Sequence, residues 1–165
     1  MPQNLVLVHI KEETVKGMYR PLFERNLVTK LSKELKGLGH KSIKKQYQRI
    51  FIELDTQSKI AAIKEKLLNI KEINYFCFPE KIKNNFEEIK SVCLKMLESS
   101  KAKSFRPKIK ITYKAYPARA NEATEELGSY LARKTNKILD FVDAELIMYV
   151  EIMENAAYVY NTIYK

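Results

Sequence analysis

The order of apolar segments in the first 78 residues is the feature that most restricts how this chain folds. Short apolar runs of strand length alternate with stretches in which apolar residues recur every three or four positions. We therefore predict strands and helices in the order β-α-β-β-α-β, which is the order of a ferredoxin-like fold. The predicted strands are 5–10, 41–48, 49–54 and 73–78; the predicted helices are 19–38, ended by Gly37–Gly39, and one capped by Asp55 or Thr56 that reaches about Leu67.

The second half of the chain predicts another small α+β unit, and we place the boundary at Pro79. Apolar residues from Ile82 to Met96 have helical spacing, and a strand is expected from about Phe105 to Tyr116. Asn121 is expected to cap a helix that continues to about Lys137. Two further strands are expected within 146–164, around a turn at Glu154–Asn155. The predicted fold class is thus α+β, with units at 1–78 and 79–165.

The charge of the chain points to an anionic partner. The 165 residues include 30 Lys and Arg against 20 Asp and Glu, a formal net charge of +10. Such basicity favours nucleic acid as the partner first and an anionic membrane surface second. The helices mix acids with bases, so a membrane role ranks last, and no apolar stretch approaches the roughly 18–20 residues that cross a bilayer. We expect a cytoplasmic protein.

Several classes of chemistry find no support in the sequence. Cys77 and Cys93 lie in separate apolar contexts, which predicts buried thiols, and the two histidines are isolated. No cluster has metal-ligand spacing, no glycine-rich phosphate loop occurs, and no nucleophile and base are singled out together. We expect no metal, no cofactor and no catalytic activity from this chain.

The segment from Lys101 to Arg119 concentrates the positive charge. It holds seven basic residues and no acid. On a strand, alternate side chains point to opposite faces, so Phe105 and Ile109 would face one side and the basic residues the other. A row of like charges repels itself unless an anion is expected, and phosphates suit such a row. The alternative is a solvated edge strand that lysines protect from aggregation.

The same segment resembles a known family. The basic strand, the YK-x-[FY]-P turn and the N-E-x5-G-S helix start are similar to the core of the THUMP domain of tRNA-modifying enzymes. The residues that carry this resemblance are Lys108, Lys110, Tyr113, Lys114, Tyr116, Pro117, Asn121, Glu122, Gly128 and Ser129. The first half is similar to the ferredoxin-like domain of 4-thiouridine synthetase, whose KG-x-x-R-x-x-F pattern is met by Lys16, Gly17, Arg20 and Phe23.

The resemblance implies an RNA-binding unit without chemistry of its own. In that family the two domains bind the acceptor stem of tRNA near its 3′ CCA end, and a separate domain with an SGG-x-DS pyrophosphatase loop performs the sulfur transfer. This sequence has neither that loop nor the reactive-cysteine domain of some members. It also has Asp143-Ala144-Glu145 where the family often has N-P-D, and Tyr19 where an asparagine usually precedes the arginine.

The leading hypothesis is a tRNA-binding module that presents the acceptor end for 4-thiouridine synthesis, with catalysis supplied by a further domain or by a partner in trans. One alternative is an adaptor for another modification, such as cytidine acetylation. Another is a ferredoxin-like ligand-binding or interaction module, which predicts an apolar patch, whereas RNA binding predicts a continuous positive surface over both units. The candidate RNA-binding residues are Lys16, Arg20, Arg106, Lys108, Lys110, Lys114, Tyr116 and Arg119; of these, Arg119 could instead only pair with Glu122.

Overall fold

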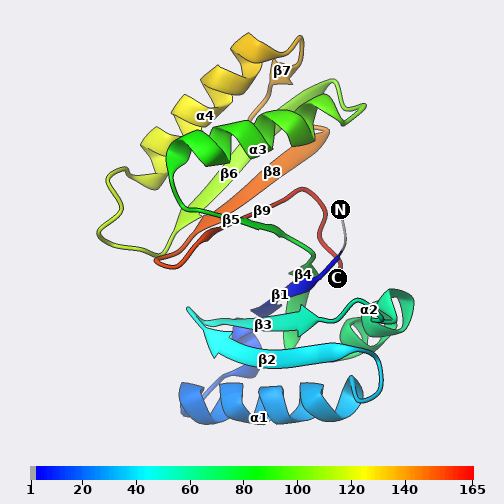
Figure 1. Ribbon diagram of the computed structural model, residues 1–165. Coiled ribbons are helices and arrows are strands. Elements are labelled where there is room, and N and C mark those ends of the chain that lie inside the picture. Colours follow the sequence, from blue (N-terminus) through cyan, green and yellow to red (C-terminus); the bar gives the residue numbers. More distant parts are fainter. Residues whose placement is uncertain (1–2) are drawn as a thin grey trace. The chain divides into compact units, whose positions relative to one another are not determined.

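The computed structural model describes residues 3–165, and these divide into two compact units (Figure 1). The first unit comprises the described residues up to Pro79 together with Thr162–Lys165, and the second comprises Glu80–Asn161. The sequence suggests that residues 162–165 end the second unit, whereas the structure groups them with the first.

The first unit is built on one four-stranded antiparallel sheet. Its strands lie in the order β2-β3-β1-β4, with β1 paired to β3 on one side and β4 on the other. This is the β-α-β-β-α-β arrangement predicted from the sequence, with one short 3-10 turn, η1, added. The elements are β1 (Leu5–Ile10), η1 (Glu12–Thr14), α1 (Arg20–Glu34), β2 (His40–Gln46), β3 (Arg49–Leu54), α2 (Ile60–Leu68) and β4 (Ile73–Cys77).

The core of the first unit forms between one face of this sheet and both helices. Alternate residues of β1, such as Val6 and Val8, join Ile50 and Ile52 of β3 in one cluster of fully buried side chains. The helices complete the cluster with residues three or four positions apart, as the amphipathic pattern predicts. These helical residues are Phe23, Leu27 and Leu31 of α1 and Ile63 and Leu67 of α2.

The predicted cap of the second helix is wrong. Lys59, not Asp55 or Thr56, occupies the N-cap position, and the Asp55 carboxylate accepts a hydrogen bond from the Gln57 amide at 2.8 Å. This turn packs tightly on Gly39, whose φ is +92° and where a Cβ would come within 2.5 Å of the Ser58 Cα. Asp55 therefore stabilises a turn against the preceding hairpin, and the helix begins later.

The second unit contains a five-stranded mixed sheet in the order β5-β9-β8-β6-β7. Strand β6 runs parallel to β7 and β8, whereas β9 is antiparallel to β8 and β5. Figure 1 shows α3 and α4 lying over the same face of this sheet. The elements are β5 (Glu80–Ile82), α3 (Phe86–Glu98), β6 (Ser104–Ile111), α4 (Ala120–Lys134), β7 (Ile138–Leu139), β8 (Leu146–Ile152) and β9 (Ala157–Tyr160).

Several predicted boundaries in the second unit need correction. Ile82 lies in the short strand β5 and not in a helix, because Glu80–Ile82 pair with β9. Arg119 is the N-cap residue of α4, so Asn121 lies inside the helix, and the helix ends before Lys137. The two-residue strand β7 was not predicted from the sequence. Apolar periodicity does not reveal such short pieces, because their pairing partners lie far away in sequence.

The C-terminal residues extend the sheet of the first unit. Tyr164 and Phe76 exchange two backbone hydrogen bonds of 2.9 and 3.0 Å, and their rings stack with centroids 5.3 Å apart. The Lys64 ammonium lies 4.7 Å from the centroid of the Tyr164 ring. Stacking and the cation–π contact both favour the paired arrangement over a detached segment.

We predict that Tyr164→Ala destabilises the first unit by about 1–2 kcal/mol, because it removes a stacked aromatic ring. Tyr164→Phe keeps the ring and serves as the matched control, with stability close to that of the unsubstituted chain. Urea denaturation measures the loss, and hydrogen exchange at the β4 amides locates it. Equal stability of the alanine and phenylalanine variants would contradict this account.

Candidate nucleic-acid interface

Strand β6 separates its apolar and basic side chains onto two faces, as predicted. Phe105 and Ile109 are buried in the core that α3 and α4 share with the sheet. Arg106, Lys108 and Lys110 alternate with them and therefore project from the opposite face. Lys108 and Lys110 are exposed and Arg106 is half-buried. The structure thus brings three of the predicted residues onto one face of one strand.

The neighbouring strand supplies residues that sequence reasoning missed. In the parallel register of β6 and β8, Lys108 lies opposite Tyr149 and Lys110 lies opposite Glu151. The Lys108 ammonium is 5.9 Å from the centroid of the Tyr149 ring, which stacks on Tyr160 with centroids 4.9 Å apart and an interplanar angle of 8°. The face that carries the basic residues therefore also carries aromatic rings.

Glu151 changes the electrostatics of this face. It is only 3% exposed, and its carboxylate accepts a hydrogen bond of 2.7 Å from the Tyr160 hydroxyl. The basic row lacks acids along its own strand, yet a carboxylate stands beside Lys110 on the next strand. The alternation of LIMYVEIM was the only sequence signal for this residue, and it does not show which strand β8 joins.

The predicted strand is wrong beyond Ile111. The Thr112 amide still donates to the Ile152 carbonyl at 2.9 Å, but β8 ends there and offers no further partner. Lys114, Tyr116 and Arg119 therefore lie in the loop between β6 and α4, with Lys114 and Arg119 exposed. They do not continue the row of strand residues.

Tyr116 is more enclosed than a free stacking residue. It is half-buried against the core of the second unit, and its ring lies 6.5 Å from that of Tyr113. Burial, with a smaller contribution from the charge of Glu126, raises the pKa of its hydroxyl. Part of the ring is therefore occupied by packing.

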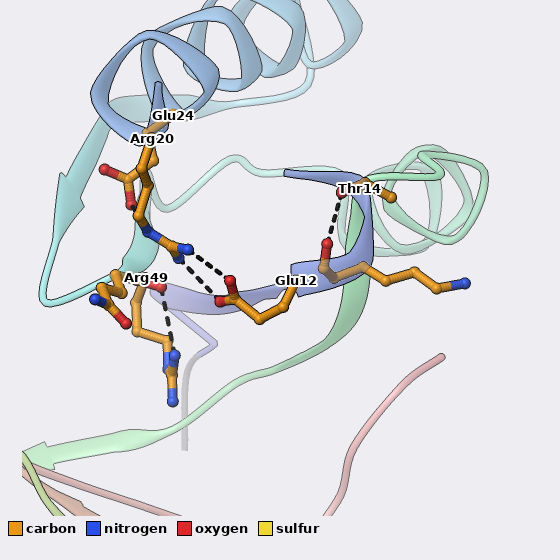
Figure 2. A network of polar contacts seen from close by, with 7 residues as sticks. Glu12, Thr14, Arg20, Glu24 and Arg49 are labelled. Carbon is orange, nitrogen blue, oxygen red and sulfur yellow. Dashed lines mark hydrogen bonds and ion pairs between the residues drawn. The ribbon is translucent and has the colours of Figure 1, made fainter. Parts of the chain in front are cut away.

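The predicted site residues of the first unit are Lys16 and Arg20. Lys16 is exposed in the segment between η1 and α1. Figure 2 shows the Arg20 guanidinium beside the carboxylates of Glu12 and Glu24. Two nitrogens of Arg20 donate to the two oxygens of Glu12, at 2.5 and 3.0 Å, and its Nε lies 3.3 Å from Glu24. The pKa of the Arg20 guanidinium is raised, mainly because it donates a hydrogen bond to Glu12.

Through these ion pairs, Arg20 stabilises the local structure. It ties η1 to the first turn of α1 through a bidentate contact, the geometry that suits a guanidinium and a carboxylate. A phosphate that bound Arg20 would have to compete with Glu12 and Glu24. Arg20 therefore holds the residues around it in position.

Both cysteines are buried, and the possible metal-ligating side chains of the described residues form no cluster. Among residues 3–165, no group of three or more His, Cys, Asp or Glu side chains is arranged to hold a metal ion. Cys77 and Cys93 are fully buried, which confirms the prediction of buried thiols, and burial raises the pKa of the Cys93 thiol to about 12. No helix in this range is long and apolar enough to cross a membrane.

Comparison with known proteins relates the chain to enzymes of tRNA thiolation. Residues 5–77 match the family model of the ThiI ferredoxin-like domain. A probable tRNA sulfurtransferase of Clostridium perfringens is 31% identical over 156 residues, which are 93% of this chain and 40% of that protein. A probable tRNA sulfurtransferase of Moorella thermoacetica is 28% identical over 159 residues. The chain thus spans about 40% of the length of these relatives.

Solved structures share the fold over nearly the whole chain. PH1313 from Pyrococcus horikoshii superimposes with a TM-score of 0.86 at 22% identity, covering 98% of this chain and 55% of that one. A 4-thiouridine synthetase in complex with RNA and ATP superimposes with a TM-score of 0.74 at 23% identity, covering 98% and 42%. The α+β fold class is confirmed, and so is the resemblance to the ferredoxin-like and following region of 4-thiouridine synthetase.

We predict a coupling energy of about 0.5–1 kcal/mol between Arg20 and Glu12, because partly exposed ion pairs of good geometry reach this range. A double-mutant cycle with Arg20→Gln and Glu12→Gln, followed by urea denaturation, measures it. The coupling should shrink at high salt. A cycle between Arg20 and Glu13, whose carboxylate lies 3.6 Å from Lys11, is the control and should show little coupling. Additive effects of Arg20 and Glu12 would contradict the bidentate contact.

Proposed function

We propose that this chain is a tRNA-binding module that holds the acceptor stem and 3′ end for thiolation, and that it has no catalytic activity of its own. Residues 1–78 would be its ferredoxin-like domain and 79–165 its THUMP domain, apart from the C-terminal segment that pairs with β4. The sulfur transfer would come from a pyrophosphatase-loop domain or a protein in trans. No membrane takes part in this proposal.

The observation that carries the proposal is the row of Arg106, Lys108 and Lys110 on the face of β6 that points away from the helices. Three cations at every second position suit the phosphates of one strand of nucleic acid. Neutralised phosphates release their counterions, which compensates for the repulsion within the row. Lys114 and Arg119 are exposed in the loop after β6 and add positive charge outside this row.

The relatives support tRNA as the nucleic acid. They are named tRNA sulfurtransferases, and they align with more than nine-tenths of this chain. A structure that shares the fold contains a 4-thiouridine synthetase with RNA bound. An adaptor for another tRNA modification is the second candidate. The region that aligns with the relatives does not by itself specify which nucleotide is modified.

We predict that the chain binds a hairpin RNA mimicking the acceptor stem, and that removal of the single-stranded CCA end weakens the binding. Fluorescence anisotropy with labelled hairpins measures both affinities, and whole tRNA provides the reference. Equal affinity with and without CCA would favour duplex recognition and remove the proposed role of the 3′ end. Absence of binding at low salt would overturn the function itself.

We predict that the double variant Arg106→Ala/Lys108→Ala binds RNA more weakly and with a lower salt dependence. The slope of log K against log [salt] should fall by about one for each lost phosphate contact. Lys33→Ala/Lys36→Ala removes the same charge from two exposed positions near the end of α1 and is the matched control. If both variants change the slope equally, net charge and not the β6 face governs binding.

A further inference from the structure

The segment between η1 and α1 exposes an apolar surface that the proposed function does not explain. Met18 is 46% exposed, Tyr19 is 73% exposed and Leu22 is 38% exposed. We call these three residues the Tyr19 patch. Tyr19 has the largest exposed fraction of any aromatic side chain among the large hydrophobic residues exposed in the described part of the chain. An aromatic ring exposed next to two further exposed apolar side chains offers a contiguous surface that a ligand can cover.

The backbone on both sides of Tyr19 is fixed. Gly17 adopts a φ of +67°, and the Met18 amide donates to the Val15 carbonyl at 2.9 Å, which closes the turn before Tyr19. The Tyr19 carbonyl accepts hydrogen bonds of 3.0 Å from the amides of Leu22 and Phe23. Tyr19 is thus presented in one backbone conformation, and binding there loses little backbone entropy.

The ion pairs shown in Figure 2 hold this arrangement together. Arg20 follows Tyr19 directly and is held by Glu12 and Glu24, so η1 and the start of α1 are joined at the residue that follows Tyr19. Glu13 in turn lies 3.6 Å from the Lys11 ammonium. Glu12, Glu13 and Glu24 therefore each have a basic partner.

Cations remain beside the patch. Lys16 is exposed three positions before Tyr19. Lys45 reaches over from β2, where its ammonium donates to the Pro21 carbonyl at 3.1 Å, and it is also exposed. An exposed aromatic ring with lysines close to it along the chain and from the neighbouring strand combines a surface for a nucleobase with charges for the adjoining phosphates.

We infer that Tyr19, flanked by Met18 and Leu22, is a stacking platform for an unpaired nucleobase of RNA, with Lys16 and Lys45 near the backbone of that nucleotide. This inference rests on the proposed function. A nucleobase suits the patch better than a protein surface, because a stable protein interface buries about 800 Å² on each partner, more than three partly exposed side chains provide. Stacking tolerates any base, so the platform favours single-stranded RNA over duplex without selecting a sequence.

The absence of tryptophan from the sequence allows a direct test. Tyr19→Trp introduces a single indole at the proposed platform, and its fluorescence is recorded during titration with a hairpin RNA that has a single-stranded 3′ overhang and with the same hairpin made blunt. Leu68→Trp is the matched control, because Leu68 is a 50% exposed apolar residue of the same unit at the end of α2. In the Tyr19→Trp variant we expect the overhang RNA to quench the indole and the blunt RNA to change it weakly. In the Leu68→Trp variant we expect no change with either RNA.

Affinity measurements complete the test. Tyr19→Ala should bind the overhang hairpin about tenfold more weakly and the blunt hairpin equally well, whereas Tyr19→Phe keeps the ring and the affinity. If the unsubstituted chain binds RNA but the indole of Tyr19→Trp is not quenched and Tyr19→Ala binds normally, the platform is overturned and the proposed function stands. If the unsubstituted chain binds no RNA, the proposed function fails. Self-association that Tyr19→Ala abolishes, measured by analytical ultracentrifugation, would assign the patch to a protein contact and overturn the inference.

Discussion

Burial of alternate β6 side chains against α3 and α4 is the constraint on which the proposed RNA surface depends. Phe105 and Ile109 are committed to the core of the second unit. A shift of one residue would place cations in that core, at a large desolvation cost. The strand therefore has one register, and Arg106, Lys108 and Lys110 have one face to occupy. The repulsion within this row is a consequence of folding that a bound phosphate chain offsets.

In the first unit, by contrast, a basic side chain is paired with acids of the same unit. Arg20 is a candidate RNA-binding residue, yet its guanidinium is held by Glu12 and Glu24. These ion pairs fix the turn that presents Tyr19. The charge of Arg20 therefore stabilises the local backbone conformation. A rigid aromatic residue loses little entropy on binding, which makes it a useful partner for a base that is already unstacked.

In the function that we propose, the two units would contribute differently to RNA recognition. The β6 row would supply salt-dependent affinity for phosphates, which carries no information about sequence. The Tyr19 patch, as we propose it, distinguishes unpaired from paired nucleotides. An acceptor end joins a duplex to a short single strand, and it offers both kinds of contact.

The sequence by itself determined the order of the main elements in the first unit, the two-unit α+β class and the segregation of apolar and basic residues along β6, because these follow from local periodicity. Only the tertiary structure decided that β6 ends at Ile111, since a strand continues only as far as its partner β8. It also decided that Glu151 and Tyr149 stand beside the lysines and that Arg20 pairs with Glu12. The end of β6 and its neighbours on β8 depend on residues distant in the chain, and the Arg20–Glu12 pair depends on how the turn between them folds. Local apolar periodicity encodes neither.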